Sequence, residues 1–196
     1  MKKNIQISVL MTVATTVLLG IVYPLLVTAL AQLLFRDKAN GQLIVQNGKT
    51  LGSRIIGQTF AGPGYFHSRP SAAGNGYDAA NSGGSNFGPT NQKLIDRVNG
   101  DLTRVQAENP GVPVPVDLIT TSASGLDPDI SPAAAAFQVN RVASERKAPE
   151  ADIAAVVSAH TEGRQLGLLG EPRVNVLELN LALDARYGAV AAKAAK

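Results

Sequence analysis

Cysteine and tryptophan are both absent from this chain of 196 residues, and histidine occurs only twice. Without cysteine the chain can form no disulfide, no thiolate metal site, no cysteine nucleophile and no lipid anchor on a thiol. The two histidines, His67 and His160, are far apart in the sequence and lack the local spacing of a zinc site. We therefore expect no metal site, and surface or hydrogen-bonded positions for both histidines.

Charge is missing from one long stretch, since no Asp, Glu, Lys or Arg lies between Ile5 and Phe35. A helix needs about 20 apolar residues to cross the hydrocarbon core, and this stretch is longer. One charged side chain at its centre would cost about 3 kcal/mol. The pattern predicts a short N-terminal tail and one transmembrane helix within residues 1–35, followed by a single soluble domain over residues 36–196.

The predicted domain is nearly neutral. Without Lys2 and Lys3, 16 of the 18 basic residues of the chain remain, against 15 acidic residues. Nucleic-acid binding needs clustered cations and aromatic stacking platforms, and this domain has no basic run and few aromatic residues. We expect no nucleic-acid partner.

A cleaved secretory signal is the alternative interpretation of the N-terminal segment. Lys2 and Lys3 would form its basic start, and Ala29-Leu30-Ala31 places small residues at a cleavage spacing. However, the apolar core of a signal runs about 7–15 residues. Here the apolar pattern continues through Phe35, which favours a retained anchor. The two lysines favour a cytoplasmic N-terminus and an extracytoplasmic domain.

Small side chains recur at every fourth position of the predicted span and form a stripe along a helix. The members of this stripe are Ser8, Thr12, Thr16, Gly20, Pro24 and Thr28. In lipid, helices associate by close packing over small residues rather than by hydrophobic burial. The stripe predicts contact with partner helices, although Ser and Thr could instead bond back to their own helix. Pro24 predicts a kink, unless neighbours satisfy the freed carbonyl group.

The fold class predicted for the domain is α+β, with helices and strands mixed in one compact unit. An Asn47-Gly48 turn predicts a hairpin of two strands, 43–45 and 51–56. Helices are expected from Asn91 to before Pro110, from Ser131-Pro132 towards Lys147, from after Pro149 to Gly163, and over 174–184. In the last segment Asn175 and Glu178 resemble a capping box, although its alternation also fits a strand.

Two further expectations concern the segment between residues 91 and 119. In its helix the apolar residues that share one face are Leu94, Ile95, Val98, Leu102 and Val105. Residues 112–116 contain two prolines and should be extended, and Leu118-Ile119 could form a short strand.

Residues 57–90 are rich in Gly, Ser, Asn and Pro and follow neither a helical nor an alternating period. A connection this long without regular structure is uncommon inside a compact domain and is often functional. Because the segment carries five aromatic residues, we expect it to pack as an ordered loop. The aromatic residues are Phe60, Tyr65, Phe66, Tyr77 and Phe87.

Patterns for catalysis are weak in this chain. The segment from Ser82 to Asn86 could offer backbone N–H groups to an anion, but it lacks a Walker lysine, and no G-x-S-x-G elbow occurs. Two hypotheses remain open. The first is an accessory subunit without a catalytic site, whose span packs among partner helices. The second is a membrane-anchored hydrolase or ligand-binding ectodomain with Ser82, Ser85 or Asp127 at its site.

Several of these stretches together carry a resemblance to a known family. They are GQTFAGPGYFHSRPSA, NSGGSNFGPTN, DLITTSASGLDPDISPAAA, QVNRVA and GEPRVNVLELNLALD, in this order behind one N-terminal span. In this combination the chain resembles the C subunit of the Kdp potassium-transporting ATPase. The match covers essentially the whole chain and is most specific over about residues 55–185.

The resemblance implies a single-span subunit of a bacterial inner-membrane complex that imports potassium at the expense of ATP. Its implied partners are a channel-like potassium-binding subunit, a P-type ATPase subunit and membrane lipid. The family's C subunit is needed for assembly and is described as a chaperone that raises the ATPase subunit's affinity for ATP, with a glutamine implicated. The matching position is Gln138, which would be a nucleotide contact.

The predicted topology places residues 36–196 outside the cytoplasm, where they cannot reach cytoplasmic ATP. Gln138 also lies in a predicted amphipathic helix, where a surface or interface position would explain it. We therefore expect that ATP and potassium are used by the complex, that this chain binds no cofactor itself, and that its effect on ATP is indirect.

Overall fold

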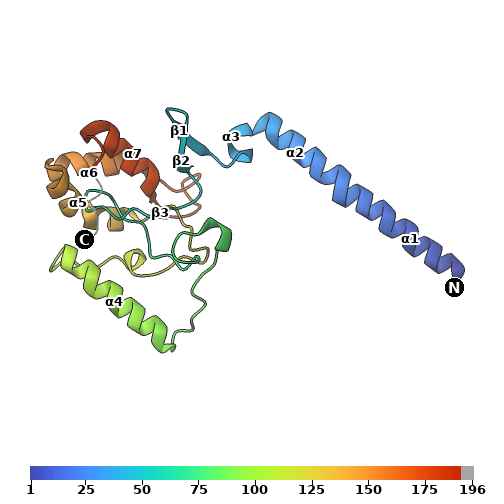
Figure 1. The fold of residues 1–196 in the computed structure, drawn as a ribbon, viewed down its shortest axis with the longest axis horizontal. Helices are drawn as coiled ribbons and strands as arrows, with labels where there is room; N and C mark the ends of the chain where they lie inside the picture. The colour runs from blue at the N-terminus through green and yellow to red at the C-terminus, as the bar shows by residue number, and fades with distance from the viewer. Residues whose placement is uncertain (191–196) are drawn as a thin grey trace. The chain divides into compact units, whose positions relative to one another are not determined.

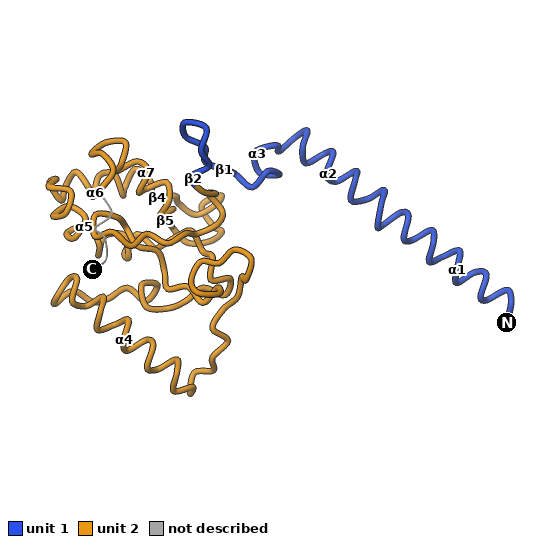
Figure 2. Tube along the Cα trace, viewed as in Figure 1, with its two compact units in different colours: residues 1–51 blue, residues 52–196 orange. Residues whose placement is uncertain are grey.

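The computed structural model describes residues 1–190 and divides the chain into two compact units, 1–51 and 52–196 (Figure 2). The first unit holds the apolar helix and a hairpin, and the second holds the mixed domain. The last six residues of the predicted domain, 191–196, lie outside the described residues. The fold class expected from the sequence, one apolar helix followed by a mixed α/β domain, is confirmed.

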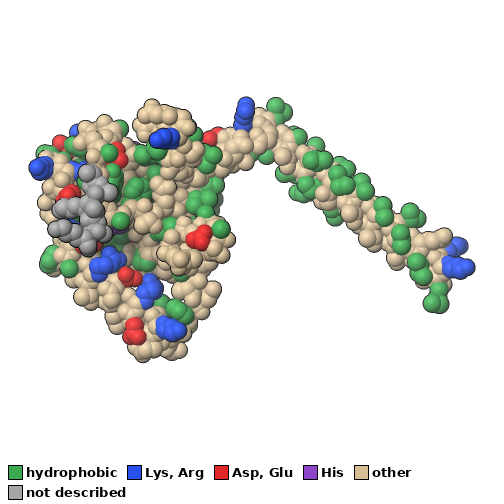
Figure 3. Space-filling view, viewed as in Figure 1, with side chains coloured by type: hydrophobic (Ala, Val, Ile, Leu, Met, Phe, Trp, Pro, Cys, Tyr) green, Lys and Arg blue, Asp and Glu red, His purple; other side chains and the backbone are tan. Residues whose placement is uncertain are grey.

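The first unit begins with a continuous helix, Lys2–Leu34, that is long and apolar enough to cross a membrane. Its most apolar window has a mean hydropathy of 2.2, and none of that window is buried inside the chain. Figure 3 shows hydrophobic side chains along its whole length, with the lysines at its N-terminal end. A helix that is apolar all round needs an apolar environment from outside the chain.

Pro24 is accommodated by a change of helix type rather than by an end of the helix. The segment consists of α1, Lys2–Val17, a π-helical turn η1, Leu18–Val22, and α2, Tyr23–Leu34 (Figure 1). At the end of η1 the backbone N–H of Tyr23 donates to the carbonyl of Leu18, five residues back. Such a turn shifts the hydrogen-bond register just before the position where proline lacks a donor.

A short helix and a hairpin follow, and the boundary between the two units, after residue 51, falls within the second strand of this hairpin. Helix α3 spans Arg36–Ala39, and strands β1, Leu43–Gln46, and β2, Lys49–Ser53, form the predicted hairpin. Asn47 and Gly48 both adopt positive φ angles, 51° and 74°, as a tight hairpin turn requires. The second strand ends at Ser53, three residues before the predicted end.

The core of the second unit is built by three helices and a small antiparallel sheet. The helices are α5, Pro132–Arg146, α6, Glu150–Ala159, and α7, Val176–Tyr187. The sheet has the order β3-β5-β4, with β3 at Asp129–Ile130, β4 at Thr161–Glu162 and β5 at Arg173–Asn175. Ile130 and Thr161 both pair with Val174. The largest fully buried apolar side chains include Phe66, Ile153, Leu179 and Leu183.

Local capping signals set the helix starts as predicted. The Ser131 hydroxyl accepts from the backbone N–H of Ala134, and the Asn175 side chain accepts from that of Glu178. The ambiguous segment 174–184 is therefore helical from Val176 onward, and only Val174 and Asn175 belong to a strand. Helix α6 ends at Ala159 rather than at Gly163, because the chain turns at His160 into β4.

One expectation around residues 91–119 is confirmed and one needs correction. Helix α4 spans Gln92–Glu108 as predicted (Figure 1), and its last residue pairs with Arg141 of α5, but of its apolar face only Val105 is buried. Ile95 and Leu102 stay 41% and 39% exposed. The strand expected at Leu118-Ile119 is wrong, since a 3-10 helix η3, Val116–Leu118, occupies that place.

Segment 57–90 packs as an ordered loop, as predicted from its aromatic residues. Its one regular element is a 3-10 turn η2, Ala79–Asn81, capped by the side chain of Asp78. Phe66 is fully buried, and Tyr65 stacks at a tilt beside Phe60 with ring centroids 5.6 Å apart. The loop lies against the helices that carry the candidate site.

Candidate functional site

Gln138 on α5 is buried and holds the loop by its backbone. Its side chain is 2% exposed. The amide oxygen Oε1 accepts from the backbone N–H of His67 at 2.8 Å, and the amide nitrogen Nε2 donates to the carbonyl of His67 at 3.1 Å. The side chain thus pairs with one loop residue as a neighbouring strand would. The expectation of a surface or interface position for Gln138 is wrong.

Asn180 on α7 does the same for the preceding loop residue. It is 1% exposed, accepts from the Phe66 N–H at 2.9 Å and donates to the Phe66 carbonyl at 2.9 Å. We refer to Gln138 with His67, and Asn180 with Phe66, as the two amide clamps. Buried backbone groups need partners, and a loop without a sheet neighbour obtains them here from side chains of two helices.

All hydrogen-bonding capacity of the Gln138 amide is used inside the chain. Besides the clamp, Nε2 donates to the Ala134 carbonyl at 3.2 Å, and Oε1 accepts from the Arg141 guanidinium at 2.6 Å. An amide has two N–H donors and one oxygen with two acceptor positions, so four bonds saturate it. A ligand could bind this amide only by replacing one of these bonds.

Two arginines of α5 fix the first part of the loop. Arg141 pairs with Glu108 at 2.8 Å and donates to the carbonyls of Pro63 and Tyr65, and burial lowers the pKa of its guanidinium. The Arg146 side chain is 1% exposed and pairs with Asp184 at 2.8 Å. Both charges are stabilised in their buried positions because each guanidinium has a carboxylate partner and carbonyl acceptors.

The same surroundings set the tautomer and the pKa of His67. Its ring Nε2 lies 3.0 Å from the carbonyl oxygen of Gly62, so the neutral tautomer that carries the proton on Nε2 donates there. Burial and the nearby Arg141 charge lower the pKa of His67 below its ordinary value of 6.5. The neutral form is the one that fits the fold at neutral pH.

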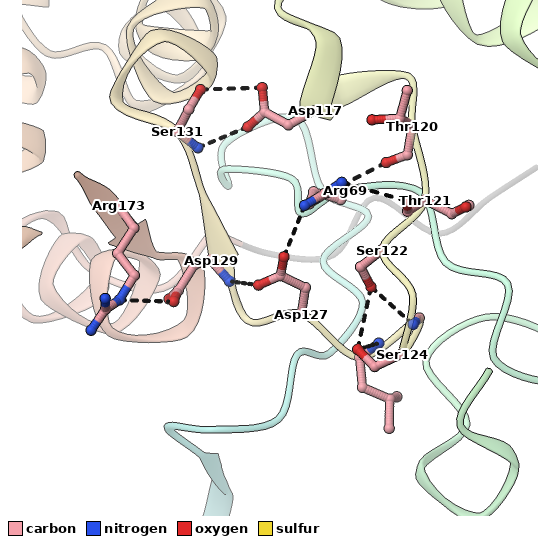
Figure 4. Close-up of polar contacts among 12 residues, drawn as sticks. Arg69, Asp117, Thr120, Thr121, Ser122, Ser124, Asp127, Asp129, Ser131 and Arg173 are labelled. Atoms are coloured by element: carbon pink, nitrogen blue, oxygen red, sulfur yellow. Dashed lines mark hydrogen bonds and ion pairs between the residues drawn. The ribbon is translucent and has the colours of Figure 1, made fainter. Parts of the chain in front are cut away.

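The second half of the loop is tied to residues 120–127. Arg69 pairs with Asp127 at 3.0 Å and donates to the carbonyls of Thr120 and Thr121 at 3.4 Å each (Figure 4). Ser71 donates to the Gly125 carbonyl at 2.6 Å. These bonds hold one wall of an open groove.

The groove has a volume of about 470 Å³ and is lined by side chains of both charges. The charged and hydroxyl groups on it are Arg69, Asp117, Asp127, Asp129, Ser131, Glu171 and Arg173. Burial and the charge of Asp127 raise the pKa of Asp129, although Arg173 lies 3.1 Å away. Asp117 accepts from both the N–H and the hydroxyl of Ser131 at 2.7 and 3.1 Å (Figure 4). The groove is therefore cross-linked by its own ion pairs.

Two of the three residues named for a hydrolase, Ser82 and Asp127, are engaged in different structural contacts. The Ser82 hydroxyl donates to the Ser124 carbonyl at 3.0 Å, and Asp127 binds Arg69 and the backbone N–H of Asp129. The Ser85 side chain is half-buried. The histidine rings contact the carbonyls of Gly62 and Val156. Among residues 1–190, no group of three His, Asp or Glu side chains is placed to hold a metal ion.

Comparison with known proteins identifies the family of this chain. The family model described as "K+-transporting ATPase, c chain" matches residues 5–185. A potassium-transporting ATPase KdpC subunit of Koribacter versatilis is 70% identical, over 94% of this chain and 95% of the relative. The chain belongs to the KdpC family. A KdpC subunit of Acidobacterium capsulatum is 57% identical over 92% of this chain and 97% of the relative. One of Caulobacter vibrioides is 58% identical, over 91% of both chains.

In this KdpC-family chain Gln138 was singled out in the sequence only through the resemblance, and there as a nucleotide contact; its structural role was not predicted. Asn180, Arg141 and Arg146 were missed altogether. A signal for Asn180 exists in retrospect, since it is a polar residue on the apolar face of a helix between Leu177 and Leu183. A buried polar residue in such a position must have a partner.

Proposed function

We propose that this chain is an accessory subunit of the ATP-driven potassium import complex and has no catalytic site of its own. The observation that supports this most directly is the helix Lys2–Leu34, no residue of which is buried within the chain. An apolar helix of this length has its place in a bilayer and among partner helices. Membership of the KdpC family supplies the complex in which such partners exist.

The partners proposed for the chain are the channel-like potassium-binding subunit and the P-type ATPase subunit, together with membrane lipid. The stripe of small residues along the helix offers the face for them. Its Thr12, Thr16 and Gly20 lie one helical turn apart, and Gly20 has only its own helix nearby, with Thr16 Cγ2 at 3.8 Å from an added Cβ. Close approach of a second backbone at these positions would be the source of affinity.

The arrangement proposed in the inner membrane has the N-terminus in the cytoplasm and the soluble domain outside. Lys2 and Lys3 at the start of the helix support this orientation. ATP and potassium would then be bound by other subunits, and this chain would need no cofactor. The saturated amide of Gln138 supports an indirect effect on ATP, because the side chain that the family resemblance points to is occupied in holding the loop.

Co-purification tests the accessory role. The triple variant Thr12→Leu, Thr16→Leu and Gly20→Leu should lower recovery of the chain with the other ATPase subunits by about tenfold or more, since bulky side chains separate the helices. The matched control, Val13→Leu with Val17→Leu, changes bulk on the neighbouring positions and should leave recovery unchanged. Equal recovery of both variants would remove the stripe from the assembly interface.

Two further measurements address topology and catalysis. Protease added to right-side-out vesicles should digest the domain, whereas inside-out vesicles should protect it; the reverse result would make direct contact with ATP credible. The purified chain without its partners should hydrolyse neither esters nor nucleotides. Turnover by the chain alone, abolished by Ser82→Ala or Asp127→Asn, would favour an anchored hydrolase instead.

A further inference from the structure

The connection between β4 and β5 presents three leucines to solvent. Leu166, Leu168 and Leu169 are 91%, 80% and 60% exposed. We refer to residues 164–171 as the leucine loop. Single exposed apolar residues are normal on a protein surface, but three exposed leucines within four positions indicate an interaction site.

The leucine loop is held in one conformation by its own hydrogen bonds. The N–H groups of Gln165 and Leu169 each donate to the carbonyl of the other residue, at 2.8 and 2.9 Å. At the base, Arg164 pairs with both carboxylate oxygens of Glu171, at 2.8 and 2.6 Å. A loop fixed in this way loses little conformational freedom when it binds a partner.

One residue of the loop is unusual in both its backbone conformation and its exposure. Leu166 has a φ of 53°, in the left-handed region that disfavours residues with a Cβ, and it is also the most exposed leucine of the loop. Glycine or asparagine would fit that backbone better and would be more soluble. Backbone strain combined with an exposed apolar side chain is characteristic of a functional position.

The charges around the loop argue against a lipid surface as its partner. Arg164 is paired with Glu171, and Arg173 is paired with Glu162 at 2.6 Å. The base of the loop is therefore neutral and presents no free cation in its contacts that would attract anionic headgroups. A neutral leucine loop with a fixed conformation instead suits an apolar pocket on a protein.

The size of the tip argues against a second copy of this chain. Three leucines fall far short of the roughly 20–30 residues on each side of an independent interface. So small a contact is sufficient where another contact already holds the two partners together and raises their effective concentration. The apolar helix of this chain provides such a second contact in a membrane complex.

We propose that the leucine loop inserts into an apolar pocket on another subunit of the same ATPase complex, on the side of the membrane where the domain lies. This inference rests on the proposed function, which supplies the complex. The loop would fix the position of the domain on its partner, while the helix provides most of the attachment. The partner's pocket should be lined by aliphatic or aromatic side chains.

Association in the intact complex tests the proposal. The triple variant Leu166→Asn, Leu168→Ser and Leu169→Ser should weaken association of the full chain by about 1,000-fold, at about tenfold for each buried leucine. The control, Val116→Ser, changes another exposed apolar residue, 67% exposed, and should stay within about twofold. Leu166→Asn alone should not lower the melting temperature, because asparagine tolerates the left-handed backbone, so weaker association would not reflect unfolding.

A unique thiol identifies the occupant, because the chain has no cysteine. The thiol of a Leu168→Cys variant should react with a soluble maleimide about tenfold more slowly in the complex than in the chain alone in vesicles. Crosslinking from it should reach another ATPase subunit. Equal protection of the chain alone in lipid vesicles would assign the loop to the bilayer, and crosslinks between two copies would assign it to self-association. Either result would overturn the proposal.

Failure of the inference is distinguishable from failure of the proposed function. If the unaltered chain and the triple variant co-purify equally well with the ATPase subunits, and the thiol of the Leu168→Cys variant stays reactive in the complex, the loop has no docking role and the accessory function stands. If the unaltered chain does not co-purify at all, the proposed function itself fails, and the loop has no complex in which to dock.

Discussion

Replacing Gln138 by leucine tests whether this residue holds the loop or contacts nucleotide. Leucine has a similar volume, so the Gln138→Leu variant loses hydrogen bonds while the packing stays nearly filled. The His67 N–H and carbonyl both lose their Gln138 partners, and the Arg141 guanidinium loses one acceptor. An unsatisfied buried polar group costs about 1–3 kcal/mol, so we expect a loss of about 3–5 kcal/mol in unfolding free energy.

A loss of this size is easily measured. At about 2–4 °C for each kcal/mol in a domain of this size, the melting temperature should fall by about 10 °C. The assay is thermal unfolding of the detergent-solubilised full chain, followed by circular dichroism. Gln92→Leu is the matched control, since Gln92 is exposed and bonds only with Asp96 on the helix surface. It should change the stability by less than about 0.5 kcal/mol.

The second amide clamp separates the structural explanation from the nucleotide explanation. Asn180→Leu removes the equivalent pair of bonds to Phe66 and should destabilise the chain by a similar amount. If both residues act by holding the loop, both variants should weaken assembly and alter ATP turnover of the complex in parallel. Because Phe66 and His67 are adjacent, the double variant should deviate from additivity by about 0.5 kcal/mol or more.

The reasoning would be refuted by one pattern of results. If Gln138→Leu raised the KM for ATP of the assembled enzyme without lowering the melting temperature, while Asn180→Leu lowered the melting temperature and left the KM unchanged, Gln138 would act on nucleotide directly. The indirect role proposed for this chain would then be wrong.

Three further predictions concern stability. The pKa of buried His67 lies below 6.5, so the unfolded chain binds more protons than the folded chain just below that pH. The contribution of His67 to the free energy of unfolding should therefore be complete above about pH 6.5. It should fall as the pH decreases, by up to about 1.4 kcal/mol per pH unit. His67→Gln should remove this dependence and His160→Gln should keep it; an unchanged slope in the first variant would contradict the assignment. Gly125→Ala should cost about 3 kcal/mol or more, because φ is 65° and the added Cβ would lie 2.7 Å from two backbone atoms. Gly111→Ala, with φ of 83° and open space, should cost only about 1 kcal/mol, and equal losses in urea unfolding would exclude the close contact. Ser131→Ala removes a helix cap and should cost about 1–2 kcal/mol in the same assay, so an unchanged midpoint would show that the cap is not needed.

Features set by neighbouring residues were predictable from the sequence. The apolar helix, the Asn47-Gly48 turn and the caps at Ser131 and Asn175 all depend on interactions within a few positions, and each is found where it was expected. The strand expected at Leu118-Ile119 was wrong because a short apolar pair has no period of its own. The exposure of the apolar face of α4 was also not predictable from local rules. An amphipathic pattern indicates that one face of a helix should be covered, but not which element covers it.

The sequence by itself determined that this protein has an apolar helix, an α+β domain, an ordered loop and the motifs of the KdpC family. Only the tertiary structure decided what the polar residues of those motifs do. Gln138 meets His67 across 71 positions, and Asn180 meets Phe66 across 114. Pairs so distant in the chain leave no periodic trace in composition or pattern, because chain folding alone brings them within hydrogen-bonding distance, and burial then makes each bond obligatory.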